Sequence, residues 1–172
     1  LALATCTNFK AYNNMFYMPP TFASSAMLCN SGLTTGTAKN NLFINASASG
    51  ASQFINAQVR ANLNTWDIDN NYYVQLPGSN ATPWAGASFV AWTASTGTPD
   101  AGTGIVATES PFLIPSYQTI GQRINLKRLF SLASDSPLIG VGQHLSYSTD
   151  LNGRQFWNPP AIGPAEYVRP AT

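Results

Sequence analysis

The stretch from Gln53 to Leu63 reads QFINAQVRANL, and its apolar side chains fall at every second position. Successive side chains of a β-strand point to opposite faces of the sheet, so this period of two predicts a strand with one buried and one polar face. The alternation therefore indicates that this part of the chain lies in a β-sheet.

The same alternation recurs in residues 71–76, 88–93 and 139–147, and turn-forming residues separate these segments. Short strands divided by turns rich in Asn, Gly and Pro are typical of a β-sandwich or barrel. Only residues 120–133 have the three-four spacing of apolar side chains that predicts a short helix. No internal repeat is expected at the periods of solenoids or propellers. The sequence therefore predicts an all-β fold, a single jelly roll of about eight antiparallel strands with at most one short helix.

The chain has 172 residues, which suits one domain, and prolines distinguish its two ends from the middle. Proline cannot donate a hydrogen bond to a β-ladder, so segments that carry it run at sheet edges or outside the sheet. We therefore predict one jelly-roll domain over residues 1–172, with an N-terminal arm or edge strand at 1–22 and a C-terminal arm at 156–172.

Charged side chains make up only 9% of the chain, and eight Lys and Arg residues against seven Asp and Glu residues leave a net charge of +1. Binding to nucleic acid by phosphate neutralisation needs a clearly basic surface, so we expect no direct, sequence-specific nucleic-acid binding. No apolar run approaches the roughly 20 residues that cross a bilayer as a helix. A neutral surface rich in amides and hydroxyls is cheaply desolvated, which suits contacts between protein subunits.

Cys6 and Cys29 are the two cysteines of the chain, too few for the disulfide framework of a small secreted domain. No CxxC or His-rich spacing indicates a zinc site. Two interpretations stay open, a disulfide between Cys6 and Cys29 or two buried free thiols.

Side chains that commonly carry catalysis are sparse in this sequence. His144 is the one histidine and falls on the polar face of a predicted strand, and no motif marks the serine and carboxylate that a triad would need. Asp100 and Glu109 are candidate carboxylates for glycoside hydrolysis, although nothing in the sequence places them in a common cleft. We therefore expect no enzyme activity, no cofactor and no metal ion.

Residues Asp67 to Asn71 place oxygen donors at alternate positions, as the first half of a calcium loop does. The second half of that pattern requires a glycine where Tyr72 stands and a glutamate where Gly78 stands. The segment is therefore predicted to be a tight turn between two strands.

Aromatic rings lie beside amide side chains in several of the predicted strands. Such rings can stack on sugars, as in a lectin, or they can fill the core of a β-sandwich. The five rings that leave both interpretations open are Trp66, Tyr72, Tyr73, Trp84 and Trp92.

The predicted strands QFINAQVRANL, NYYVQL, SFVAWT and LIGVGQHLSY, together with the proline-bearing ends, resemble a viral single jelly-roll capsid protein. The chain is most similar to the smaller coat proteins of tailless icosahedral double-stranded DNA bacteriophages with an internal membrane, of the Thermus phage type. The resemblance implies a self-assembling capsid subunit in the virion, assembled in the host cytoplasm. It also implies contacts with copies of itself and with a second capsid protein, above a membrane beneath the shell.

The aromatic and arginine side chains near the C-terminus are the expected interface residues, because such side chains often dominate binding energy. They are Phe156, Trp157, Tyr167 and Arg169. The tail that carries them either exchanges between neighbouring subunits or folds back on its own domain. Two other functions remain open, a carbohydrate-binding β-sandwich and a pilus or filament subunit that assembles by strand donation.

Overall fold

The structure of the chain is a computed structural model. It describes residues 2–3, 8–29, 35–57, 65–95, 97, 99–100, 105–108, 132–146, 149–150 and 153–164. Within these residues the chain forms ten β-strands and one short helix. The elements are β1 (Ala2–Leu3), β2 (Phe9–Tyr12), β3 (Met15–Met18), β4 (Ser25–Cys29), β5 (Gly36–Lys39), β6 (Leu42–Asn45), β7 (Gln53–Ala57), β8 (Trp66–Asp69), β9 (Tyr72–Gln75), α1 (Phe89–Thr93) and β10 (Ile105–Ala107).

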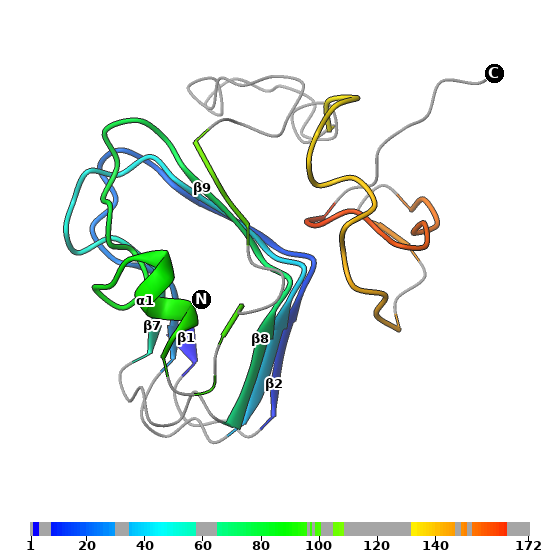
Figure 1. The fold of residues 1–172 in the computed structure, drawn as a ribbon, viewed down its shortest axis with the longest axis horizontal. Coiled ribbons are helices and arrows are strands. Elements are labelled where there is room, and N and C mark those ends of the chain that lie inside the picture. The colour runs from blue at the N-terminus through cyan, green and yellow to red at the C-terminus, as the bar shows by residue number, and fades with distance from the viewer. Residues whose placement is uncertain are drawn as a thin grey trace.

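The strands form three sheets, which the chain visits in a fixed order. Sheet A contains β1, β4 and β7, sheet B contains β2, β5 and β8, and sheet C contains β3, β6, β9 and β10. After each strand of sheet C up to β6 the chain returns to sheet A and begins the next circuit. Figure 1 shows the resulting stack of coils, with one sheet on each of three sides. This arrangement is a parallel β-helix.

Each coil pairs in parallel with the next, at offsets of 26 to 33 residues. Met15 lies beside Leu42, which is 27 residues later, and Leu42 lies beside Tyr72, a further 30 residues on. The sequence does contain a solenoid repeat, so the expectation of none was wrong. The repeat is hard to see because the coils differ in length and share few identical residues.

The all-β prediction is confirmed, but the predicted antiparallel jelly roll is not what these strands form. Every ladder between the named strands is parallel. A period of two identifies a strand and its buried face, yet it carries no information about the direction of the neighbouring strand. The direction is decided by connections that run around the coil.

The predicted strand at Gln53–Leu63 is present as β7, whose described part ends at Ala57, and the one at 71–76 is present as β9. In the region predicted as a strand from Ile139, the described residues up to 146 form turns and irregular backbone instead. Most of the helix predicted at 120–133 lies outside the described residues.

The predicted strand at 88–93 is wrong, because these residues form helix α1. The Ser88 side chain accepts a hydrogen bond from the Ala91 backbone N–H and caps the helix N-terminus. Trp92 is buried whereas Val90 is 77% exposed, although a strand would place these two side chains on the same face. The helix instead directs Phe89 and Trp92, three residues apart, toward the core of the coils.

The interior of the coils is filled by aromatic rings stacked in register. Phe16 stacks on Phe43 with ring centroids 4.8 Å apart, and Phe43 stacks on Tyr73 at 5.2 Å. Phe89 of α1 packs against Tyr73 and Trp84 with centroids 5.9 and 5.3 Å away. Each coil therefore contributes one ring to a continuous column, and α1 covers its later end.

A second position in each coil alternates between large and small side chains. Phe9 of β2 and Trp66 of β8 lie edge to face at 6.1 Å, and Gly36 of β5 lies between their strands. A Cβ atom on Gly36 would lie 1.7 Å from the Phe9 ring. The Phe9 ring therefore packs into the space that a side chain on Gly36 would occupy.

The described residues from 132 onward, 132–146, 149–150 and 153–164, are called the C-terminal segment. This segment packs against the outer face of sheet C. Leu138, Ala161 and Ile162 are buried together with Leu42 and Val74 of that sheet. Backbone hydrogen bonds from Ile162 N to Leu138 O and from Gly163 N to Asn40 O hold the segment in place. The described part of the predicted C-terminal arm thus folds back on its own chain. Among the described residues, no helix has the length and apolar character needed to span a membrane.

Candidate functional site

The sharp corner between sheets B and C is built from a recurring asparagine. Asn13, Asn40 and Asn70 have backbone φ angles of 54°, 55° and 58°. Asn and Asp tolerate this left-handed conformation better than other side chains that carry a Cβ. The corner therefore selects Asn in each of these three coils. Asp100 has a similar φ of 51°, but its carboxylate accepts the hydrogen bonds of Asn71, the residue that follows the third corner.

A second asparagine follows each of the first three corners and forms a ladder inside the coils. The Asn14 backbone N–H and Nδ2 donate to Asn41 Oδ1 at 3.0 and 3.1 Å. Asn41 donates in the same way to Asn71 Oδ1 at 3.0 and 2.9 Å. Each asparagine also uses Nδ2 to donate to a backbone carbonyl of sheet B, as Asn71 does to Ala38 O. The ladder satisfies polar groups that the turn would otherwise bury unpaired.

Asp100 ends this ladder. Its Oδ1 accepts from the Asn71 backbone N–H at 3.3 Å and from Asn71 Nδ2 at 3.0 Å. Its Oδ2 accepts from the Tyr73 hydroxyl at 2.7 Å and from Trp92 Nε1 at 3.2 Å. An ionised carboxylate only accepts hydrogen bonds, so it suits a position where every neighbour is a donor. Asp100 thus joins the ladder, the aromatic column and α1.

Burial governs the ionisation of this cluster. Loss of hydration raises the pKa of Asp100, while hydrogen bonds from Tyr73, Trp92 and Asn71 act in the opposite direction. Burial also raises the pKa of Tyr73 well above 10.0, and the neighbouring charge of Asp100 raises it further. The folded protein therefore strongly favours the neutral form of Tyr73.

The raised pKa of Tyr73 predicts a loss of stability at alkaline pH. The unfolded chain releases the phenolic proton near pH 10.0 and the folded chain does not, so the stabilisation is fully present below pH 10 and declines as the pH rises above it. Tyr73→Phe removes this dependence and also the hydrogen bond to Asp100, at a cost of about 1 kcal/mol at neutral pH. Urea unfolding between pH 8 and 11 should show the two proteins converging; a constant difference would contradict the prediction.

The corner asparagines bind the C-terminal segment on the outside of the coils. Asn40 Nδ2 donates to Gln143 O at 2.7 Å, and Asn40 Oδ1 accepts from the Gln143 backbone N–H at 2.8 Å. Asn70 Nδ2 donates to Val141 O at 2.9 Å and to Asn40 Oδ1 at 3.0 Å. At the second and third corners, the first asparagine therefore binds the C-terminal segment and the second binds the neighbouring coils.

Loss of the Asn40 side chain should loosen the C-terminal segment without disturbing the corner. Asn40→Gly preserves the backbone conformation, because glycine adopts positive φ freely. We expect hydrogen exchange in residues 138–146 to become about tenfold faster, as local opening becomes easier. Asn8→Gly is the matched control, because Asn8 also has a positive φ, of 59°, but is exposed. Equal exchange in Asn40→Gly and the native chain would contradict the prediction.

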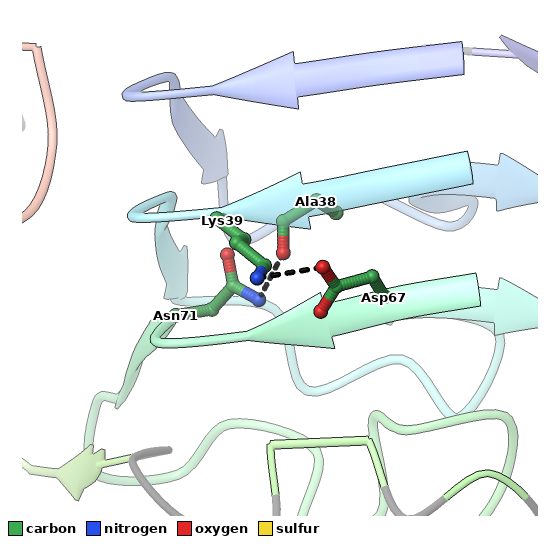
Figure 2. Close-up of polar contacts among 4 residues, drawn as sticks. All are labelled: Ala38, Lys39, Asp67 and Asn71. Atoms are coloured by element: carbon green, nitrogen blue, oxygen red, sulfur yellow. Dashed lines mark hydrogen bonds and ion pairs between the residues drawn. The ribbon is translucent and has the colours of Figure 1, made fainter. Parts of the chain in front are cut away.

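The outer face of sheet B carries the charges of the predicted calcium segment. Lys39 Nζ lies 2.6 Å from Asp67 Oδ2, and Figure 2 shows this pair reaching across β5 and β8 while Asn71 turns back to Ala38 O. The predicted turn between two strands is present at Asn70 and Asn71, because β8 ends at Asp69 and β9 begins at Tyr72, whereas Asp67 to Asp69 belong to β8 itself. The described residues contain no group of three metal-ligating side chains.

The first coil ends in an open edge. Among the described strands, β2 pairs only with β5, and β3 pairs only with β6. Phe16 is half-buried, whereas its counterparts Phe43 and Tyr73 are fully buried. This edge, made by β2, β3 and the exposed Asn14 between them, is called the open end below. It is the candidate association surface of the molecule.

The aromatic side chains that the sequence offered for sugar binding lie in the core. Trp84 and Trp92 are each 1% exposed and Trp66 is 5% exposed. Tyr73 stands in the inner column, and Tyr72 is covered by the C-terminal segment. None of these five rings forms an exposed platform, so the core interpretation is the correct one.

The predicted interface residues are only partly described. Phe156 and Trp157 are half-buried, and Phe156 lines a small cavity with Asn13 and Gln143. Tyr167 and Arg169 lie outside the described residues, as do Glu109, Cys6 and the side chain of Cys29. The disulfide therefore stays a prediction.

The other residues considered for catalysis lie in different environments. His144 is exposed in the C-terminal segment. Asp100 is 2% exposed and ends the ladder. Sequence reasoning considered Asp100 only as a catalytic carboxylate, and it missed the ladder that Asp100 forms with the asparagine pairs. The signal that would have found them is the dipeptide Asn-Asn at residues 13, 40 and 70, each time followed by apolar residues.

Comparisons with protein-family models, with curated proteins and with solved structures give no match to this chain.

Proposed function

We propose that the chain is a structural subunit of a larger protein assembly, in the setting of a virus shell to which the sequence resemblance points. The observation that carries the proposal is the open end, where β2 and β3 each offer one side of their ladders to a partner and Met15 and Phe16 of β3 are half-buried. Unpaired strand edges of this kind readily add further strands.

The placement of the reactive side chains supports the same proposal. Asp100 accepts hydrogen bonds from the ladder and from Tyr73 and Trp92. Lys39 forms an ion pair with Asp67. These groups serve the fold, and the rings that a lectin would need are buried. Stacked rings and a hydrogen-bonded ladder give a stiff module, which is what a shell component requires.

In this proposal the protein acts in the virion, through contacts with copies of itself and with a second capsid protein, and it has no catalytic role. The shell would be built from β-helical modules, because the described strands do not form a jelly roll.

Electron microscopy with light scattering on the purified chain, over a range of protein and salt concentrations, tests the proposal. Rings, sheets or closed shells are the expected result. Linear filaments would favour the filament subunit instead. A monomer that binds no capsid protein under any condition would overturn the proposal.

A further inference from the structure

The asparagine ladder has a direction. At each step the earlier coil supplies two N–H donors and the later coil supplies one side-chain oxygen. Asn14 donates from its backbone N–H and Nδ2, and among the described residues no donor reaches its Oδ1. Asp100, at the other end, has both oxygens occupied. The ladder is therefore closed at Asp100 and open at Asn14.

The apolar column is open at the same end. Met15 and Phe16 are half-buried, while Leu42 and Phe43 beside them are fully buried. Phe16 is parallel to Phe43 within 12°, so its stacking geometry is that of the interior of the column. At Met15 and Phe16 the first coil thus has the chemistry of an inner coil and the exposure of a terminal one.

We propose that the open end binds one more parallel β-coil, supplied by a polypeptide segment outside these 172 residues, with an asparagine placed to donate to Asn14 Oδ1. This inference rests on the proposed function, because it identifies the binding partner of the open end, the surface on which that function is based. The partner segment combines an Asn-Asn corner with apolar residues, as this chain does at Asn40, Asn41 and Leu42–Asn45.

A second copy of this chain fits the open end poorly. Two open ends facing each other would bring Asn14 Oδ1 against another Asn14 Oδ1, and both atoms are acceptors. The opposite end of a copy presents a ladder closed by Asp100, whose carboxylate has no hydrogen to donate. An asparagine on a parallel coil supplies the required backbone and side-chain donors, as the three existing steps show.

The register of the coils defines a covalent test. Ala2 pairs with Leu28, and Leu28 pairs with Asn56, so Leu1 corresponds to Ile55. A copy of residues 36–54 placed directly before Leu1 therefore sets a second Gly36–Lys39 beside β2 and a second Leu42–Asn45 beside β3. The 27-residue spacing between Phe9 and Gly36 is preserved.

The extended chain should show amide exchange about tenfold slower in residues 9–18 than the native chain, with a higher urea midpoint. The matched control carries Asn41→Ala in the added copy only, and we expect it to lose most of the protection. The same 36–54 segment added as a free peptide should protect residues 9–18 at high peptide concentration. Residues 66–75, at the far side of the stack, should not respond.

Three results would overturn the inference. One is an extended chain with unchanged exchange in residues 9–18, and another is equal protection by the Asn41→Ala copy. The third is a native chain that already dimerises with residues 9–18 protected, which would make a second copy the partner. If the chain forms shells but its open end does not bind the added coil, the inference fails and the proposed function still stands. Failure of the inference can therefore be distinguished from failure of the proposed function.

Discussion

Replacing Asp100 with alanine should lower the free energy of unfolding by about 3 to 5 kcal/mol, because it leaves several buried donors without an acceptor. The substitution removes the partner of Asn71 Nδ2, the Tyr73 hydroxyl and Trp92 Nε1 together. Since Trp92 belongs to α1, we also expect the helix to lose its anchor on the coils. Urea unfolding followed by tryptophan fluorescence measures the change.

Two further variants separate the causes. Asp100→Asn keeps an oxygen for Asn71 but places an amide N–H₂ against Trp92 Nε1, which can only donate, so we expect a smaller loss of about 1 to 2 kcal/mol. Asp67→Ala is the control, because the Asp67 side chain is 58% exposed and its pair with Lys39 is worth less than about 1 kcal/mol. Equal losses for Asp100→Ala and Asp67→Ala would show that the ladder does not need its carboxylate.

Replacing Gly36 with alanine should cost about 3 kcal/mol, because the added methyl group would occupy the place of the Phe9 ring. Three ring atoms of Phe9 lie 1.7, 1.8 and 2.7 Å from the Cβ position. Phe9 must then leave a site where it is 7% exposed and give up its contact with Trp66. Thermal or urea unfolding measures the loss.

Gly50→Ala is the matched control, because nothing lies within 4 Å of a Cβ atom at Gly50. We expect that variant to be within about 0.5 kcal/mol of the native chain. Adding Phe9→Leu to Gly36→Ala should recover part of the stability, since a smaller side chain leaves room for the methyl group. Without such recovery, the cost at Gly36 would have to come from the backbone rather than from Phe9.

Several features of this protein could be read from local sequence. The alternation in β7 and β9 predicted strands because it depends only on the two-residue geometry of an extended backbone. The core interpretation of Trp66, Trp84 and Trp92 was one of the two that the sequence left open, and their burial confirms it. A turn was predicted over Asp67 to Asn71 from its departure from the calcium pattern, and the structure places the corner at the end of that segment, at Asn70 and Asn71.

Helix α1 shows where local pattern is insufficient. The residues FVAWT fit a period of two, which would place Val90 and Trp92 on one face, but the helix buries Trp92 and exposes Val90. What selects the helix is the contact of Phe89 with the aromatic column and of Trp92 with Asp100. Both contacts are made to residues of other segments, so the five residues themselves do not contain the information.

Strands β7 and β9 and the low charge followed from the order of residues, because each is a property of neighbours along the chain. Strand direction, the coiled path and the roles of Asn41 and Asp100 were decided by tertiary structure. Each of these depends on pairing between residues 27 to 30 positions apart, as for Met15, Leu42 and Tyr72. An asparagine before a strand predicts a turn whatever the rest of the fold. It forms part of a ladder only where the next coil places an acceptor about 3 Å from its donors, as Asn71 does for Asn41.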